Sequence, residues 1–474
     1  MKRRIVSLLL ALALLLTGLL TFASCGNNKG PAQDLSEFSF DTSKEVTITF
    51  YHTMGEALRA VLDQYIVEFN KLYPNIIIKH EQVGSYDDVR SQIETEITVG
   101  NQPNIAYCYP DHVALYNVAD AVQTLDNLIA STEVITRADG TTEVLGLTQQ
   151  QIDNFIDGYY NEGKQYGDDK MYTLPMSKST EVFYYNKTFF DANGLTPPKT
   201  WDELEALCKR IKEIDPDCIP LGYDSEANWF ITMCEQYGSP YTSATGDHFL
   251  FDNETNRNFV AKFREWYQKG YVTTQEISGG YTSALFTKRD SEAGKCYMCI
   301  GSSAGANHQI PKDADTGEFY FEVGIASIPQ VNAEAPKVIS QGPSLCIFKK
   351  ADSQEVLASW LFVKYLTTTV EFQAAFGMTS GYVPVLENVT DVPAYADRLA
   401  KADGYANLAL LSTKVCLAQI DAYYTSPAFN GSSTARDEVG KLMQACFTTT
   451  ESDVAAAIKK AFEKAVAECI YQAG

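Results

Sequence analysis

The amino-acid sequence predicts an α/β fold in which helices cover the faces of mostly parallel sheets. Short apolar runs of strand length alternate with longer segments whose apolar residues recur every three or four positions. The chain has 474 residues, of which 45% are hydrophobic, and this suffices for two or three domains with sizeable cores. Because ligands bind beyond the carboxyl ends of strands in such sheets, we expect a binding site there.

The fold is predicted to begin with a regular alternation of strand and helix. The first helix is indicated by apolar residues that include Leu58, Leu62, Tyr65 and Phe69, and Tyr73-Pro74-Asn75 ends it. The elements predicted here are strands at Val46–His52, Ile76–His80 and Asn104–Tyr109, with helices at Gly55–Leu72 and Tyr86–Val99.

The middle and end of the chain continue the pattern after a weakly patterned stretch at residues 119–165. Residues 170–175 and 181–186 are predicted to be extended. Thr200 and Glu203 form a capping box that begins a helix, and Trp201, Leu204 and Ile211 lie on its buried face. Further helices are expected at 226–237, 254–269, 352–367 and 453–471, and further strands at 296–300, 322–328 and 344–348.

The N-terminus has the pattern of a targeting signal. Lys2, Arg3 and Arg4 precede an apolar run at Ile5–Leu20, which is shorter than the roughly 20 residues of a membrane anchor. Small residues before Cys25 resemble a bacterial lipoprotein signal, and an ordinary signal peptide or anchor is the alternative. We expect residues 1–24 to be removed, Cys25 to carry lipid, and residues 25–43 to be a flexible tether. The protein would then be held at the outer face of the cell membrane.

Charge and composition exclude several classes of function. The formal net charge of −22 argues against a nucleic acid or an anionic membrane surface as partner. The ten cysteines after Cys25 are scattered, and Cys296-x-x-Cys299 has no second motif to complete a metal site. The five histidines lack the close spacing of common zinc motifs, and no phosphate-binding GxxxxGK[ST] loop occurs. We therefore expect no metal and no cofactor.

One segment fits the pattern of a nucleophilic serine. Gly301-Ser302-Ser303-Ala304-Gly305 matches G-x-S-x-G, which in hydrolases is followed by an acid and then a histidine. The only later histidine is His308, five residues after Ser303. No acid can fall sensibly between them. A secreted serine hydrolase is thus a remote alternative, and no catalytic residue is expected.

Several motifs together resemble the family 1 extracellular solute-binding proteins of ABC importers. They are the opening Phe-Tyr-His-Thr-Met at residues 50–54, the segment Tyr-Tyr-Asn-Lys at 184–187 with Pro-Pro-Lys-Thr-Trp-Asp-Glu-Leu at 197–204, and Gly-Tyr-Val-Pro at 381–384. They occur in the expected order over most of residues 45–470. The resemblance implies a periplasmic-binding-protein-like fold of type II, with two lobes joined by a hinge. It also implies a small-molecule ligand between the lobes, permease subunits as partners, and a monomer.

Under this resemblance the chain divides between the lobes in four segments. Residues 44–151 and 295–343 would form lobe 1, and residues 152–294 and 344–474 would form lobe 2. Within the family, the chain most resembles the sn-glycerol-3-phosphate-binding proteins. The positions that match ligand-binding residues of that group are Tyr86, Ser179, Trp229, Ser302, Ser303, Gly342, Tyr382 and Arg436. Asp111 stands next to Pro110, which occupies the position of an acidic ligand residue.

The chemistry of these residues suits an anion joined to a polyol. Arg436 offers a planar fork for two phosphate oxygens, and Ser302 and Ser303 add donors at an expected helix start. We therefore expect glycerol 3-phosphate or a glycerophosphodiester as the ligand. The alternative is a mono- or oligosaccharide, because Tyr86, Trp229 and Tyr382 could equally stack on sugar rings. A structural or adhesive lipoprotein would show no stabilisation by ligand.

Overall fold

The computed structural model describes residues 39–473. The predicted signal peptide at 1–24, Cys25, and the tether up to residue 38 lie outside the described residues. Within the described range, no helix has the length and apolar character needed to cross a membrane.

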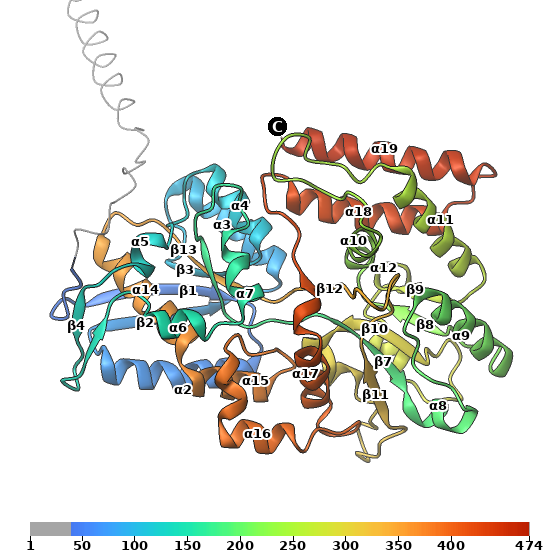
Figure 1. Ribbon diagram of the computed structural model, residues 1–474, viewed down its shortest axis with the longest axis horizontal. Coiled ribbons are helices and arrows are strands. Elements are labelled where there is room, and N and C mark those ends of the chain that lie inside the picture. The colour runs from blue at the N-terminus through green and yellow to red at the C-terminus, as the bar shows by residue number, and fades with distance from the viewer. Residues whose placement is uncertain (1–38, 474) are drawn as a thin grey trace, which may run out of the picture. The chain divides into compact units, whose positions relative to one another are not determined.

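Two five-stranded sheets organise the chain (Figure 1). The first has the order β2-β1-β3-β13-β6, in which β1 pairs in parallel with β2 and β3, and β13 pairs antiparallel to β3 and β6. We call this sheet and its helices the first lobe. Its strands are β1 (Val46–His52), β2 (Ile76–Gln82), β3 (Ile105–Cys108), β6 (Thr173–Pro175) and β13 (Ser344–Ile347).

The second sheet has the order β11-β7-β10-β8-β9 and belongs to what we call the second lobe. Here β8 pairs in parallel with β9 and β10, whereas β7 pairs antiparallel to β10 and β11. Each sheet therefore has one strand that opposes the other four, which confirms the mostly parallel arrangement. The strands are β7 (Glu181–Asn186), β8 (Leu221–Tyr223), β9 (Val272–Thr274), β10 (Met298–Ser302) and β11 (Val323–Ala326).

The strand pairings correct the predicted division of the chain between the lobes. Residues 295–343 were expected in lobe 1, but β10 and β11 pair in the second sheet. Residues 344–474 were expected in lobe 2, but β13 pairs in the first sheet and the following helix packs on it. Hydrophobic periodicity predicts that a strand is buried, but the pairing partner is distant in sequence and leaves no local signal.

Helices cover the sheets of both lobes. In the first lobe α14 packs on β1 and β13, and α15 packs on α2. The helices of this lobe are α2 (Glu56–Leu72), α3 (Tyr86–Val99), α4 (Pro110–Val118), α5 (Asp126–Ile129), α6 (Gln149–Asp153), α7 (Asp157–Asn161), η2 (Glu162–Lys164), α14 (Ser353–Thr368) and α15 (Val370–Thr379).

In the second lobe α10, α11, α18 and α19 pack against one another, and α17 packs on β7 and β11. The long elements are α8 (Lys187–Asn193), α9 (Trp201–Ile214), α10 (Glu226–Tyr237), α11 (Glu254–Gln268), α17 (Leu408–Ala418), α18 (Ser432–Thr448) and α19 (Val454–Ala473). The short ones are α12 (Gln275–Ser278), α13 (Ser283–Phe286), η3 (Ser303–Gln309) and η5 (Ile420–Ala422). Between α15 and α17 lie η4 (Glu387–Asp391) and α16 (Pro393–Leu399).

Local sequence signals explain where the best-predicted helices begin. The amide of Glu203 donates to Thr200 Oγ1 at 3.2 Å, and Glu203 Oε2 accepts from the amide of Thr200 at 3.3 Å. This capping box satisfies two amides that would otherwise lack partners at the start of α9. Trp201, Leu204 and Ile211 are buried, as predicted from their spacing. An equivalent box, built by Ser85 and Asp88, begins α3.

Three segments of chain connect the two lobes and lie side by side. Residues 176–180 join β6 to β7, residues 339–343 lead from the second lobe into β13, and the third segment runs from α15 to α17. Lys178 exchanges backbone hydrogen bonds with Val383 at 3.0 and 2.6 Å, and Ser179 exchanges two with Gln341 at 2.8 Å each. Backbone hydrogen bonds thus join the three connections into one short ladder of strand-like pairs. Such a set of crossing segments is expected to act as a hinge between two lobes.

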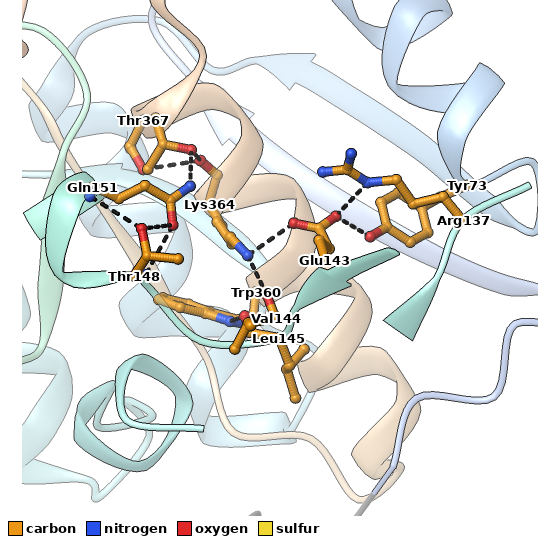
Figure 2. Close-up of polar contacts among 11 residues, drawn as sticks. Tyr73, Arg137, Glu143, Val144, Leu145, Thr148, Gln151, Trp360, Lys364 and Thr367 are labelled. Carbon is orange, nitrogen blue, oxygen red and sulfur yellow. Dashed lines mark hydrogen bonds and ion pairs between the residues drawn. The ribbon is translucent and has the colours of Figure 1, made fainter. Parts of the chain in front are cut away.

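A partly buried carboxylate fastens a small hairpin to the first lobe (Figure 2). The hairpin consists of β4 (Val134–Thr136) and β5 (Thr142–Val144), in the stretch that had no clear pattern. Glu143 Oε1 accepts from Arg137 Nε at 2.8 Å and from the hydroxyl of Tyr73, and Glu143 Oε2 accepts from Lys364 Nζ at 2.8 Å. Trp360 Nε1 donates to the carbonyl of Leu145 at 2.8 Å. These contacts tie the hairpin to the end of α2 and to α14.

A histidine pair, of which His52 is fully buried, joins β1 to β2 in the same lobe. The amide of Met54 donates to His52 Nδ1 at 3.1 Å, so His52 Nε2 carries the hydrogen and donates to His80 Nδ1 at 2.9 Å. His80 Nε2 then donates to Asp63 Oδ1 at 2.8 Å. Burial, with the neighbouring His80 and Arg59, lowers the pKa of His52 to about 3. The ring is therefore neutral in the folded protein.

We expect this pair to make stability depend on pH. The folded pKa of His52 lies below its unfolded value of 6.5, so the unfolded chain binds the extra proton and stability falls as pH drops from 6.5 toward 3. The contribution is about 1.4 kcal/mol per pH unit. Unfolding by urea at pH 4 to 7 should show this slope, and His52→Gln should reduce it. An identical slope in the variant would contradict the assignment.

Candidate ligand-binding site

A cavity of about 690 Å³ opens where the carboxyl ends of strands from both sheets meet. Residues that follow β2 and β3 line it from the first lobe, and residues that follow β8, β9 and β10 line it from the second. This is the position expected for a ligand site in parallel sheets. The connecting segments contribute Ile339, Ser340, Gln341 and Gly342.

Tyrosines form the wall contributed by the first lobe. Tyr86 is the first residue of α3, and its ring centroid lies 4.6 Å from that of Tyr109, which follows β3. The Tyr86 hydroxyl lies 3.4 Å from the hydroxyl of Tyr382, which belongs to the third connecting segment. Burial raises the pKa of all three phenols, so they act as neutral donors and acceptors with apolar faces.

A hydrogen-bonded chain of polar groups forms the wall contributed by the second lobe. Arg436, in the first turns of α18, donates to Asn228 Oδ1, and Asn228 Nδ2 donates to Glu181 Oε1 at 3.1 Å. The hydroxyl of Tyr223 donates to Glu181 Oε2 at 2.7 Å. Burial raises the pKa of Glu181 to about 7, although the hydrogen bonds from Tyr223 and Asn228 oppose that shift. This carboxyl therefore gives up its proton less readily than an exposed glutamate does.

Polar contacts also join the two lobes across the mouth of the cavity. Arg90 Nη1, on α3, donates to Ser433 Oγ at 2.7 Å, and Ser433 Oγ donates to Asp111 Oδ2, on α4, at 3.1 Å. Arg90 Nη2 also lies 3.3 Å from Asp87 Oδ1 and 3.9 Å from Asp437 Oδ2. Arg90 of the first lobe thus contacts the first turn of α18, the helix that also carries Arg436.

The structure brings five of the nine predicted ligand residues to the cavity: Tyr86, Asp111, Ser302, Gly342 and Arg436. Gly342 has φ of +95°, and a Cβ there would lie 2.5 Å from the carbonyl oxygen of Ser177, so only glycine fits. Asp111, next to Pro110, reaches the site through its contact with Ser433.

The other four predicted residues lie near the cavity without lining it. Tyr382 touches Tyr86, and Ser179 pairs through its backbone with Gln341. Ser303 is fully buried, and its Oγ accepts from the amide of Thr180 at 3.1 Å, so it supports η3 instead of facing the cavity. A nucleophilic role for Ser303 has no support in this position.

The structure corrects the prediction that Trp229 lines the ligand site. Trp229 is fully buried in the core of the second lobe, where its ring stacks on Tyr223 with centroids 4.7 Å apart. Its neighbour Asn228 faces the cavity, and the next residue of an α-helix is rotated by about 100°, which turns Trp229 into the core. The spacing of motifs placed the helix correctly, but it did not determine which face carries the site.

Sequence reasoning missed several residues that line the cavity: Arg90, Tyr109, Glu162, Glu181, Asn228 and Ser433. Glu181 left a usable signal, because it is an acidic residue at the start of an otherwise apolar strand. Glu162 left none, since it lies in the stretch without clear pattern.

The thiols take no part in the cavity. The cysteines among residues 39–473 are all free and buried, and Cys296 and Cys299 lie in or beside β10. Burial raises the pKa of both thiols, which keeps them protonated. The described residues contain no group of three or more histidine, cysteine, aspartate or glutamate side chains able to hold a metal ion.

Comparison with known proteins identifies the family. Residues 64–402 match the family described as bacterial extracellular solute-binding protein. The sn-glycerol-3-phosphate-binding periplasmic protein UgpB of Escherichia coli K12 is 24% identical over 363 residues, which are 73% of this chain and 76% of UgpB.

Solved structures share the two-lobed fold. UgpB of Mycobacterium tuberculosis in complex with glycerophosphocholine has a TM-score of 0.70 and 17% identity, and the match covers 90% of this chain and 99% of that one. The cyclic α-maltosyl-1,6-maltose binding protein of Arthrobacter globiformis has a TM-score of 0.66 and 17% identity, covering 89% and 99%. The chain therefore belongs to the bacterial extracellular solute-binding proteins, which capture small molecules for ABC importers.

Proposed function

We propose that this protein binds a glycerophosphodiester and delivers it to the permease of an ABC importer. The observation that carries the proposal is that two arginines line the cavity: Arg90, which donates to Ser433 in the first turn of α18, and Arg436, which belongs to α18 itself. Guanidinium groups and the start of a helix both favour a phosphate group. A diester keeps one negative charge on the phosphate and carries an alcohol on either side.

The size and remaining chemistry of the cavity favour the diester over glycerol 3-phosphate. A volume of about 690 Å³ is typical of sites for larger ligands than a three-carbon phosphate. Glu181 and Asp224 are acceptors for glycerol hydroxyls or for a cationic alcohol, and burial raises the pKa of both. Tyrosine faces such as those of Tyr86 and Tyr109 suit a quaternary ammonium group. Glycerophosphocholine, the ligand named for the M. tuberculosis structure, has these features.

A second candidate ligand is an oligosaccharide. Six carboxylates line the cavity with only two arginines: Asp87, Asp111, Glu162, Glu181, Asp224 and Asp437. Carboxylates and aromatic faces are the groups that hold sugar hydroxyls and rings, and the A. globiformis neighbour is named for a maltose-type ligand. This ligand would leave the two arginines without an anion.

A ligand screen separates the candidates. Calorimetry and thermal unfolding should be measured with glycerophosphocholine, glycerol 3-phosphate and maltotriose. We expect glycerophosphocholine to bind most tightly, and at 100 times its dissociation constant to stabilise the protein by about 2.7 kcal/mol. Binding of maltotriose alone would reject the diester in favour of the sugar.

We further propose that the mature protein is a monomer anchored by lipid on Cys25. The small residues before Cys25 and the short apolar run support the lipid anchor. Metabolic labelling with a fatty acid should mark the wild-type protein and leave Cys25→Ser unlabelled, and a labelled variant would contradict it.

A further inference from the structure

A buried ion pair lies between the cavity and the connecting segments. Glu162 is the first residue of η2, is 2% exposed, and lines the cavity. Lys178 is fully buried in the first connecting segment, and its Nζ lies 2.5 Å from Glu162 Oε1. Neither residue was predicted to bind ligand, although Lys178 is adjacent to Ser179 in sequence.

Lys178 contacts all three connecting segments. Its backbone exchanges hydrogen bonds with Val383 of the third segment. Its Nζ donates to the carbonyl of Gly342 at 3.3 Å and to Ser344 Oγ at 3.0 Å, at the end of the second segment and the start of β13. The ammonium group thus bonds to the second segment, and the backbone of the same residue bonds to the third.

Glu162 retains capacity to accept a hydrogen bond from a ligand. Its Oε1 accepts from Lys178 and from Ser344 Oγ at 3.4 Å, whereas its Oε2 accepts from Ser340 Oγ at 3.4 Å, which is a long contact. A carboxylate has about four acceptor sites. In a site removed from water, an unused acceptor on a charged group binds a hydroxyl or ammonium donor strongly.

We propose that Glu162 is a ligand contact for a hydroxyl or ammonium donor, and that Lys178 is the positioning residue that links this contact to the hinge. The proposal rests on the function proposed above, that the cavity binds a solute. A ligand donor at Glu162 fixes the carboxylate, the carboxylate fixes the ammonium group of Lys178, and that group holds the connecting segments in the closed arrangement. A ligand shifts the balance between open and closed lobes only through such differential contacts.

The test measures affinity and closure separately. Glycerophosphocholine affinity is measured by calorimetry, and closure by the decrease in radius of gyration in X-ray scattering at saturating ligand. We expect Glu162→Gln to weaken binding about tenfold or more, as for loss of a hydrogen bond to a charged group. Lys178→Met touches no ligand, and we expect it to reduce the decrease in radius of gyration.

A double variant tests the same contact with less risk that the protein fails to fold. Glu162→Gln combined with Lys178→Met removes both buried charges, which proteins tolerate better than the loss of one. Its matched control is Glu143→Gln with Lys364→Met, which removes a buried pair of the first lobe that does not line the cavity. We call Glu162→Gln with Lys178→Met the hinge variant. We expect weaker binding and less compaction in this variant and wild-type behaviour in the control.

Three outcomes decide the matter. Weaker binding and less compaction in the hinge variant, with a normal control, support the inference. Wild-type affinity and compaction in the hinge variant overturn it and leave the proposed function intact. Wild-type protein that binds neither glycerophosphocholine nor maltotriose overturns the proposed function, and the inference with it.

Discussion

Replacing Arg436 with alanine should weaken binding of glycerophosphocholine by about 100-fold or more. Each hydrogen bond from a guanidinium group to a phosphate contributes about 1.5–3 kcal/mol, and 1.4 kcal/mol is a tenfold change in affinity. Arg436 faces the cavity and its contact in the protein is the amide oxygen of Asn228, so its removal leaves no buried carboxylate without its ion-pair partner. Calorimetry of the variant measures the loss, and thermal unfolding without ligand should change little.

Two further variants test the cause of that loss. Arg436→Lys keeps the charge but not the planar fork, and we expect an affinity between those of the wild-type and alanine proteins. Arg257→Ala removes an arginine of the same lobe that pairs with Asp252 and does not line the cavity, and we expect no change in affinity. Unaltered binding in Arg436→Ala would reject Arg436 as the phosphate ligand.

The largest loss of stability is expected at Glu143. Alanine at this position deprives Arg137, Lys364 and Tyr73 of their shared acceptor, and Lys364 is almost fully buried. Removal of one partner from a buried ion pair costs about 3–5 kcal/mol, which urea unfolding at pH 7 would measure.

The pH dependence of that loss has a defined sign. Burial already lowers the pKa of Lys364, and the carboxylate of Glu143 opposes that shift. Without the carboxylate, a neutral Lys364 is easier to bury, so the destabilisation should shrink as pH rises toward the ordinary lysine value. The double variant Glu143→Gln with Lys364→Met should recover part of the stability. A loss that stayed constant from pH 7 to 10 would contradict this explanation.

Local signals predicted many elements of the fold with accurate bounds. β1, α3 and α10 begin and end at the predicted residues, because each has a regular apolar period and a clear start or stop. The stretch at 119–165 gave no such pattern, since it contains a short hairpin and helices of four or five residues. The lobe that each strand joins was predicted poorly, because β10 and β13 pair with strands far away in sequence.

Five of the nine predicted ligand positions line the cavity. Arg436, Tyr86 and Gly342 line the cavity as the resemblance implied. Asn228 was missed and Trp229 was chosen, although they are adjacent, because the side chain that faces a cleft depends on how its helix packs. The role proposed for Glu162 could not be predicted from the sequence, because it follows only from the contact of Glu162 with Lys178 in the first connecting segment.

The burial of every described cysteine gives the protein a built-in set of unfolding reporters. Cys108 and Cys346 lie in the first sheet, whereas Cys208, Cys234 and Cys469 lie in the core of the second lobe. An alkylating reagent reaches such thiols only after local opening. Brief alkylation at increasing urea, followed by peptide mass analysis, would show which lobe opens first without any engineered label.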